Sequence, residues 1–388
     1  MARRVAIVGA GVLGLACARE LAAAGDVDVT VVERSYPGAG STSLSVGVFT
    51  RQYLTAEDID IRVRGVAALA ELEASAGLNL RRIGLLRPAR DAPTLERCAE
   101  AVALQRERGV DDAEVLDPAG VRALVPGFDA VGVVGGIWCP SDGYLDGAEL
   151  CSLLAEAAQE AGARIHGRTR VTGLRRGGAG ARYTLATDRG DVAADVVVNA
   201  AGAWAGAVGD LLDAPVGVVN ERHEAYSFEL PESRPAATIP MVLDYVPGSG
   251  AGEGLYFRQE GHGQLIAGLH SNEPLGEPVD DPDDYFRGAG DEAAERVVEL
   301  LAAALPGIDG IGYRGGWSGL YPHSPDGGLV AGPHPANPDV IVAGGLGGNG
   351  LSVALPLGRT VAEWIRHGEP RSLPAAERLV PRPAVVAG

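Results

Sequence analysis

Three segments of the chain share one order of apolar and polar positions: a short apolar run, a glycine-rich turn and a longer amphipathic run. The first has an apolar run at Val5–Val8, a predicted helix over Gly11–Ala24 and a second apolar run at Val27–Val32. The others lie at Ala194–Gly206 and at residues 339–365. Continuous apolar runs are typical of strands buried on both faces, and the order strand, helix, strand predicts a βαβ unit.

Other elements follow from periodicity and from helix start signals. Thr55 followed by Asp58 resembles a capping box with aspartate in place of glutamate, and an apolar face at helical spacing comes after it. From about Val216 to Ser271 the pattern alternates as in strands, with a hairpin turn at Gly-His-Gly. Residues 80–140 predict short strands and one helix. The helix in that region is predicted over Thr94–Arg108, and further helices are predicted over Gly147–Ala161 and Asp291–Ala304.

Strand–glycine–helix segments at the start, middle and end of the chain predict one domain assembled from separate pieces. A chain of 388 residues is also longer than a single hydrophobic core usually needs. We expect an α/β domain of the Rossmann type and a second α+β domain with a mostly antiparallel sheet. The first would comprise residues 1–84, 142–216 and 317–388, and the second residues 85–141 and 217–316.

Charge and residue usage exclude several classes of function. The net charge of −18 disfavours nucleic acid or an anionic membrane as a partner. The chain contains no lysine, which excludes a lysine Schiff base. No apolar run approaches about 18 residues, so we expect no membrane span. The acidic run Asp280–Asp284 reads as a solvated loop rather than a metal site. The cysteines form no CxxC pair and fit a reducing cytoplasm; they are Cys17, Cys98, Cys139 and Cys151.

Gly9, Gly11 and Gly14 form a GxGxxG motif between the first predicted strand and helix. Gly9 permits a tight turn, Gly11 lets the backbone approach a pyrophosphate, and Gly14 allows close helix–strand packing. The helix N-terminus offers free N–H groups to the phosphates. Glu33 ends the second strand, where a carboxylate accepts hydrogen bonds from ribose hydroxyls and disfavours the extra phosphate of NADP. The motif predicts a dinucleotide but does not separate NAD from FAD.

Two further loops favour FAD, because its ribityl chain and ring system extend beyond the pyrophosphate. Ser41, Thr42, Ser43 and Ser45 offer hydroxyls on a small-residue loop shortly after the second strand. Gly344–Ser352 joins a strand to a helix, and a helix N-terminus there would stabilise an anionic reduced flavin. The alternatives are an ordinary surface loop for the first segment and a glycine turn without a ligand for the second.

Six segments resemble the D-amino-acid-oxidase-type (DAO) family of FAD oxidoreductases, in the family's order and over nearly the whole chain. They are VAIVGAGVLGLACARELAAAG with its following VVER, GSTSLSVG, DGYLDGAEL, VVNAAGAWA, WSGLYPHSPDG and GGLGGNGLS. The branch with sarcosine oxidases, sarcosine-oxidase β subunits and glycine oxidases is the most similar. The resemblance implies an FAD-binding domain, a substrate domain whose antiparallel sheet lies over the flavin, and contact between the Val171 backbone and the adenine.

The resemblance also implies individual site residues. Arg51 stands where an arginine binds the substrate carboxylate, and a guanidinium suits bidentate carboxylate binding. Tyr256, His270 and Tyr321 match residues of the substrate pocket, and His323 lies on the same loop as Tyr321. The residues expected to contact FAD are Gly9, Gly11, Val12, Leu13, Gly14, Glu33, Arg34, Gly40, Ser41, Thr42, Ser43, Ser45, Gly47, Val171, Ala200, Gly202, Trp204, Gly345, Gly347, Gly348, Asn349, Gly350, Leu351 and Ser352.

Departures from the family pattern concern the flavin link and the reaction with oxygen. Ile266 stands in place of the lysine that activates oxygen in sarcosine oxidases, and Ser352 lies near the place of a second lysine. Tyr321 replaces the carboxylate-binding arginine of glycine oxidases, so that either Arg51 alone anchors the carboxylate or the substrate is not an amino acid. We expect non-covalent FAD, because the positions that carry covalent flavin in relatives hold, or lie near, Gly319, Leu44 and Gly147.

The expected activity is FAD-dependent oxidation of a C–N bond in an amino acid or N-alkyl amino acid. Hydride would pass to flavin N5 and leave an imine that water hydrolyses, and the electrons would go to O2 or to a carrier. One alternative is a 2-hydroxy acid dehydrogenase or an oxidase of a cyclic imino acid on the same fold. Another is a flavin-binding assembly factor or subunit with little turnover. The sequence leaves the substrate, and a homo- or hetero-oligomeric state, open.

Overall fold

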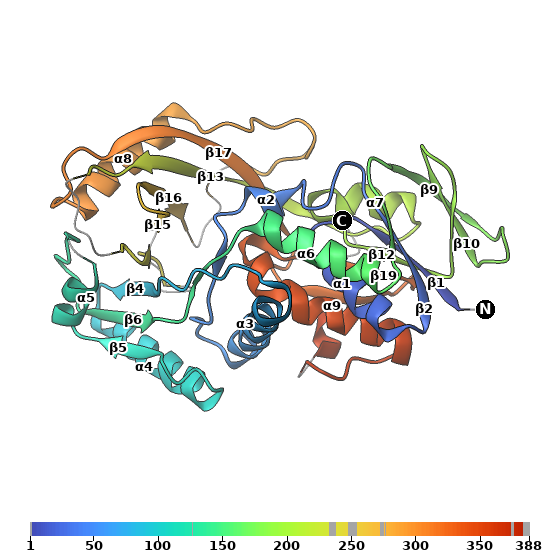
Figure 1. Cartoon of the computed structure of the whole chain (residues 1–388), viewed down its shortest axis with the longest axis horizontal. Coiled ribbons are helices and arrows are strands. Elements are labelled where there is room, and N and C mark those ends of the chain that lie inside the picture. Colours follow the sequence, from blue (N-terminus) through green and yellow to red (C-terminus); the bar gives the residue numbers. More distant parts are fainter. Residues whose placement is uncertain are drawn as a thin grey trace.

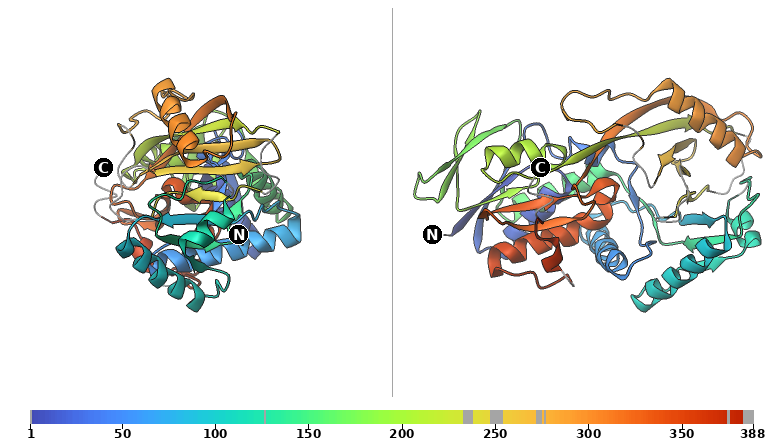
Figure 2. Two further views of the ribbon diagram at one scale, coloured as in Figure 1. Left: turned by 90° about the vertical axis from the view of Figure 1, so that its left-hand side faces the viewer. Right: turned by 180° about the vertical axis from the view of Figure 1, so that it is seen from behind.

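The computed structural model describes residues 2–125, 127–232, 238–246, 254–271, 275, 277–373 and 376–382 (Figure 1). The molecule is elongated and has two halves, each built on its own sheet. The long strands that lead from one half toward the other are visible from the front and from behind (Figures 1 and 2).

The Rossmann half contains a six-stranded sheet. In spatial order its strands are β18 (Val330–His334), β19 (Asn337–Gly344), β12 (Val196–Asn199), β1 (Arg3–Val8), β2 (Val27–Val32) and β8 (Arg164–His166). All neighbours are parallel except β18 and β19, which form an antiparallel hairpin at one edge. Segments from the start, middle and end of the chain therefore meet in one sheet, as the repeated strand–glycine–helix pattern predicts.

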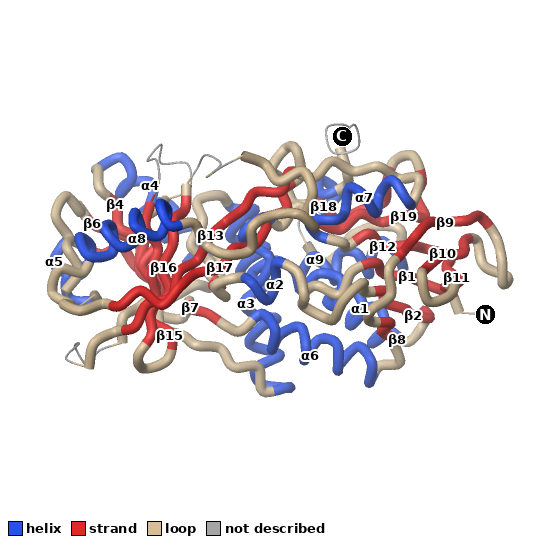
Figure 3. The backbone as a smooth tube through the Cα atoms, turned by 90° about the horizontal axis from the view of Figure 1, so that it is seen from above, coloured by secondary structure: helices blue, strands red, loops and turns tan. Residues whose placement is uncertain are grey.

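The two faces of this sheet are covered by different elements. Along β1, Val5 and Ile7 pack in the core beneath a layer of helices, whereas Ala6 and Val8 pack in the core of the opposite face. The helical layer consists of α1 (Val12–Ala24), α3 (Ala56–Ala76), α6 (Gly147–Glu160) and α9 (Gly350–His367). The opposite face carries β9 (Val171–Arg176), β10 (Tyr183–Thr187), β11 (Val192–Ala194) and α7 (Ala205–Leu211). Figure 3 shows α6 and α7 on opposite sides of this half.

The second half contains an eight-stranded sheet. Its order is β17 (Gly312–His323), β13 (Val219–Glu229), β16 (Gln264–His270), β15 (Gly254–Glu260), β14 (Met241–Leu243), β4 (Leu85–Ala89), β6 (Gly135–Cys139) and β5 (Glu114–Leu116). Its pairs are antiparallel apart from β14–β4, which agrees with the predicted second domain. Phe228 and Phe257 of this sheet form a core with Val297 and Leu301 of α8 (Asp291–Ala304).

The remaining elements are short. They include α2 (Ser41–Leu44), the two-stranded ribbon of β3 (Val48–Phe49) and β7 (Gly143–Tyr144), and 3₁₀ turns at Gly202–Trp204, Gly347–Asn349 and Ala376–Leu379. Helix α3 crosses the first turn of α9 at Gly65, where an added Cβ would lie 1.8 Å from the Ser352 carbonyl oxygen. Only glycine permits this approach, which fixes the position of the α9 N-terminus.

Local signals in the sequence predict several helices closely. Helix α8 has the predicted bounds, and α3 begins where the Thr55 hydroxyl accepts the Asp58 N–H at 3.2 Å. Helix α4 (Ala92–Glu107) starts two residues earlier than predicted, because Asp91 caps it. The expectation of one helix in residues 80–140 is wrong: Asp117 caps a second one, α5 (Pro118–Leu124), which has proline at its first position. The domain boundaries stay a prediction, and the one at residue 316 falls inside β17.

Candidate active site

A cavity of about 910 Å³ lies between the two halves. It begins at the glycine turn after β1, passes α2 and the N-terminus of α9, and ends at strands β13, β15, β16 and β17. Its size suits a cofactor together with a small substrate. Every residue expected to contact FAD lines this cavity except Gly14 and Ser43.

The glycine turn has the geometry that the GxGxxG motif predicts. Gly9 has φ +106°, and a Cβ there would lie 2.5 Å from the Ala200 carbonyl oxygen. A Cβ on Gly14 would lie 2.0 Å from the Gly9 carbonyl oxygen, so Gly14 serves the packing of α1 and not the cavity wall. Gly11 precedes α1 and supplies no side-chain cap. The first turn of α1 therefore offers backbone N–H donors at the cavity wall, apart from the Val12 N–H, which the Thr42 hydroxyl accepts.

Backbone N–H groups at and near this turn hold the side chain of Glu33 in place. Its two carboxylate oxygens accept the N–H groups of Ala10 at 2.9 Å and Ser35 at 2.7 Å. Each oxygen keeps acceptor capacity for a ribose hydroxyl, and both Glu33 and Val171 line the same end of the cavity as the glycine turn. This end has the donors and acceptors that an adenosine and its pyrophosphate require.

Arg34, Trp204 and Asp283 form a contact between the two halves at this end, which we call the Asp283 clasp. The Arg34 guanidinium lies 3.8 Å from the Trp204 ring centroid, and it forms an ion pair of 2.7 Å with Asp283. The Trp204 indole donates to Asp283 at 3.1 Å. The hydrogen bond from Arg34 lowers the Asp283 pKa. The aspartates of Asp280–Asp284 are exposed, as the interpretation of a solvated loop predicts, and Asp283 in addition pairs with Arg34. Among the described residues no acidic, histidine or cysteine cluster could hold a metal ion.

The small-residue loop after β2 connects both halves to the glycine turn. The Ser41 hydroxyl donates to the Leu320 carbonyl at 2.6 Å, and the Thr42 hydroxyl accepts the Val12 N–H at 3.3 Å. Ser43 points elsewhere and donates to the Gly38 carbonyl at 2.7 Å, which explains its absence from the cavity wall.

The third glycine segment packs directly against the far strands. A Cβ on Gly347 would lie 2.4 Å from His323 Cε1, and one on Gly348 would lie 2.5 Å from Tyr321 Cε2. The Tyr53 hydroxyl donates to the side-chain oxygen of Asn349. Because Asn349 does not cap α9 with its side chain, the first N–H groups of α9 remain as donors at the cavity.

The far end of the cavity has a wall of aromatic and histidine side chains. The structure brings together four residues that the sequence singles out, Tyr256, His270, Tyr321 and His323. Burial lowers the pKa of His270 to about 4, so its imidazole is neutral at pH 7. Burial also raises the pKa of Tyr321 to about 12 and raises that of Tyr256, so both phenols stay protonated. Sequence reasoning missed further lining residues, which are Tyr53, Arg87, Glu221, His223 and Tyr245.

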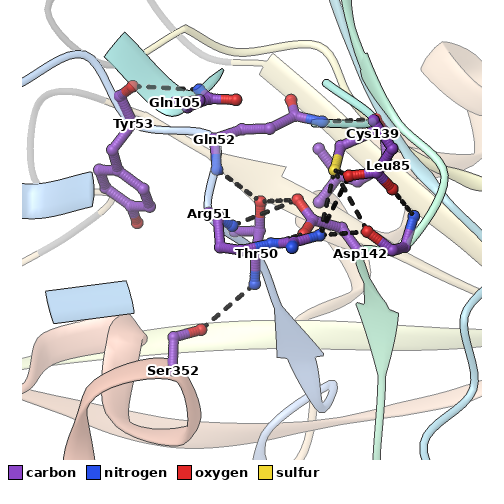
Figure 4. A network of polar contacts seen from close by, with 11 residues as sticks. Thr50, Arg51, Gln52, Tyr53, Leu85, Gln105, Cys139, Asp142 and Ser352 are labelled. Atoms are coloured by element: carbon purple, nitrogen blue, oxygen red, sulfur yellow. Dashed lines mark hydrogen bonds and ion pairs between the residues drawn. The ribbon is translucent and has the colours of Figure 1, made fainter. Parts of the chain in front are cut away.

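Arg51 has a different environment from the expected one. Its Nε donates to Asp142 Oδ1 at 2.9 Å, and Nη2 contacts Cys139 Sγ at 3.2 Å and the Ser141 hydroxyl (Figure 4). Arg51 is not among the residues that line the cavity. In Figure 4 the ring of Tyr53 points away from this network. A buried aspartate thus binds the guanidinium of Arg51 through Nε, and the assignment of Arg51 to the substrate carboxylate stays a prediction.

Arg87 is a buried arginine that does line the cavity. Its side chain donates from Nη1 to the Tyr245 carbonyl at 2.7 Å, and its Nε has no hydrogen-bond partner. No carboxylate of a described residue forms an ion pair with it. Burial lowers its pKa, but a guanidinium remains charged in proteins. Its only sequence signal is an arginine inside the apolar strand LLRPA.

The model of the FAD-dependent oxidoreductase family named DAO matches residues 4–364. The chain belongs to the DAO family. Mitochondrial dimethylglycine dehydrogenase of Homo sapiens is 27% identical over 379 residues, which cover 94% of this chain and 42% of that protein. This chain thus spans about two fifths of the length of that relative. Glycine oxidase of Geobacillus kaustophilus is 27% identical, and the matched region covers 94% of this chain and 93% of that protein.

Solved structures agree with this membership of the DAO family. L-proline dehydrogenase from P. horikoshii superposes with a TM-score of 0.84 at 25% identity, over 97% of this chain and 96% of that chain. The predicted fold class is confirmed. The residues present fit the family's FAD: the N-termini of α1 and α9, the Gly9 turn and the Glu33 carboxylate border one elongated cavity. None of the helices within the described ranges has the length and apolar character to cross a membrane.

Proposed function

We propose that this chain catalyses FAD-dependent oxidation of a C–N bond in a small amino acid or N-alkyl amino acid. Membership of the DAO family supports the cofactor and the reaction class. The names of the relatives support the substrate class, since they include glycine oxidase and 4-methylaminobutanoate oxidase. The single observation that carries the substrate class is Arg87, a buried cation in the cavity wall without a carboxylate partner among the described residues.

Arg87 would bind the carboxylate of the substrate. A buried, unpaired charge is costly, and an anionic ligand that enters the cavity removes that cost. The guanidinium has free donors: Nε is unbonded, and only Nη1 contacts a carbonyl. A planar donor pair suits the two oxygens of a carboxylate. Arg51 would not perform this task, because Asp142 accepts from its Nε, and Cys139 and Ser141 contact its Nη2.

Bound FAD would supply the acceptor for a hydride, which the side chains of this protein lack. The chain would contribute orientation. Tyr256, Tyr321 and His270 would form walls around the amine and exclude water from it. The donors at the α9 N-terminus, packed on Tyr321 and His323, would stabilise negative charge at the edge of the ring system.

The cofactor would be held without a covalent bond. Gly319 and Leu44, two of the positions linked to flavin in relatives, lie against each other, since a Cβ on Gly319 would approach Leu44 Cβ to 3.2 Å. Neither residue has a nucleophilic side chain. The electron acceptor would be O2 or a protein carrier, and Ile266 leaves its position without a cation that would speed the reaction with oxygen.

One purification tests the proposal. Acid precipitation should release the yellow colour into the supernatant. Anaerobic addition of glycine, N-methylglycine, proline or 4-methylaminobutanoate should bleach the flavin in at least one case. A flavin that no amine bleaches, but that a 2-hydroxy acid does, would contradict the proposal and favour a hydroxy acid dehydrogenase.

A further inference from the structure

Glu221, His223 and His323 form a cluster at the end of the cavity, and of the three the sequence predicts only His323 as a site residue. Glu221 and His223 lie two residues apart on β13, so they share one face of the sheet. On β17, Tyr321 lies opposite Glu221, and His323 lies opposite Val219. The strand register therefore places both imidazoles beside the same carboxylate.

The Glu221 carboxylate is a hydrogen-bond partner of His223 and lies near His323, whose Nε2 has no hydrogen-bond partner among the described residues. The Oε2 atom of Glu221 lies 3.3 Å from His223 Nε2 and 3.6 Å from His323 Nε2. The shorter contact assigns the proton of neutral His223 to Nε2, which donates to the carboxylate. Nδ1 of His223 then carries the lone pair and has no hydrogen bond to a described residue. The His223 ring stacks on Tyr321 at 3.8 Å between centroids, which fixes its orientation.

We propose that His223, oriented by Glu221, accepts the proton of the substrate ammonium group. The inference rests on the proposed function, in which an amine enters this cavity. In the step, the N–H bond of the ammonium breaks, an N–H bond forms at His223 Nδ1, and the nitrogen regains its lone pair. The imidazolium then pairs with Glu221, and no oxidant is needed. Oxidation of the C–N bond follows this step, because a protonated nitrogen has no lone pair to support it.

The surroundings of His223 suit this task. Burial lowers the pKa of His223, and the carboxylate of Glu221 opposes that shift, so the imidazole is neutral at pH 7 and can accept a proton. Glu221 is a positioning residue because it acts through His223. The titratable groups that face His223 are Glu221 on its own strand, His270 on β16, Tyr256 on β15, and Tyr321 and His323 on β17.

The test is the pH dependence of anaerobic flavin reduction in the purified holoenzyme, followed by stopped flow. The probe is whichever of glycine, N-methylglycine, proline or 4-methylaminobutanoate reduces the wild type. His223→Asn should reduce flavin about 10²-fold more slowly at pH 7. It should recover toward the wild-type rate as the pH approaches the pKa of the free amine, because the substrate then arrives unprotonated. Glu221→Gln should move the acidic limb of the profile to lower pH, since it removes the charge that raises the His223 pKa.

The matched control is His262→Asn, which changes an exposed histidine in the turn between β15 and β16 and should leave the profile unchanged. A deficit of His223→Asn that is equal at all pH values would assign only a structural role to His223 and overturn the inference. A pH profile of His223→Asn equal to that of the wild type would also overturn the inference, but it would leave the proposed function intact. If no amine reduces the wild type, the proposed function and this inference both fail.

Discussion

Arg51 donates from Nε to Asp142 at 2.9 Å, and the side chain of Asp142 is fully buried. The Thr50 hydroxyl donates to the other oxygen of the same carboxylate at 2.6 Å. Burial raises the pKa of Asp142, and Arg51 and Thr50 act against that shift. The pair joins the segment between β3 and α3 to the segment between β6 and β7, next to the ribbon that β3 and β7 form.

Replacement of Arg51 by methionine should therefore lower the free energy of unfolding. The loss should be about 3 kcal/mol, because the buried carboxylate would keep its desolvation cost without its partner. The double variant Arg51→Met, Asp142→Asn should recover part of this loss. Urea unfolding with excess FAD measures both effects. A KM that rises tenfold while stability stays unchanged would return Arg51 to the role of carboxylate anchor.

Arg87→Met should raise KM for a carboxylate-bearing amine on the order of 10²-fold, since two charge-assisted hydrogen bonds are lost. The amine of the same skeleton without a carboxylate should react equally well with the variant and the wild type. Steady-state kinetics with both compounds measures this difference. Arg90→Met is the control, because Arg90 is exposed and pairs with Asp244 on the surface. Equal KM values in wild type and Arg87→Met would show that Arg87 does not bind the substrate carboxylate.

The Asp283 clasp should slow the loss of FAD. Asp283→Asn breaks the ion pair with Arg34, and we expect the FAD dissociation constant to rise between roughly twofold and tenfold, since the pair is half-exposed. Added salt should weaken FAD binding by the wild type more than by the variant. Fluorescence of released FAD measures both quantities. Asp280→Asn, an exposed change in the same loop, is the control. Identical dissociation constants for Asp283→Asn and wild type would show that the clasp does not retain the cofactor.

His270 should make stability depend on pH. Burial lowers its pKa to about 4, below the ordinary value of 6.5, so the unfolded chain binds the extra proton between these values. Stability is then lost as the pH falls from 6.5 toward 4. From pH 7 to pH 5 the wild type should lose about 2 kcal/mol more than His270→Asn does. Urea unfolding at both pH values measures this, with His262→Asn as the control. Equal losses in wild type and His270→Asn would mean that the imidazole is not buried in its neutral form.

The parts of the site that local sequence determines could be predicted. The Gly9 turn and the Thr55 cap each depend on residues within a few positions, and glycine or threonine is required there by backbone geometry. Glu33 follows from the length of a βαβ unit, which fixes where the second strand ends. Family resemblance added Tyr256 and His270, which line the cavity.

The parts that distant segments create could not be predicted. Arg51 lies 91 positions from Asp142, and nothing near Arg51 in sequence indicates a buried partner. Glu221 meets His323 only through the register of β13 and β17. Asp283 meets Arg34 across 249 positions, and its acidic neighbours are typical of a solvated turn. Arg87 resembles any arginine in a strand until the cavity is known.

Anaerobic flavin reduction by pairs of compounds with one carbon skeleton tests the central claim most directly. Each pair consists of an amino acid and the 2-hydroxy acid with the same carbon skeleton, such as glycine with glycolate or alanine with lactate. N-methylglycine and proline are tested beside these pairs. The account predicts that amines alone bleach the flavin, with release of ammonia, a primary amine or a cyclic imine. Bleaching by the 2-hydroxy acids, with none by any amine, would contradict it.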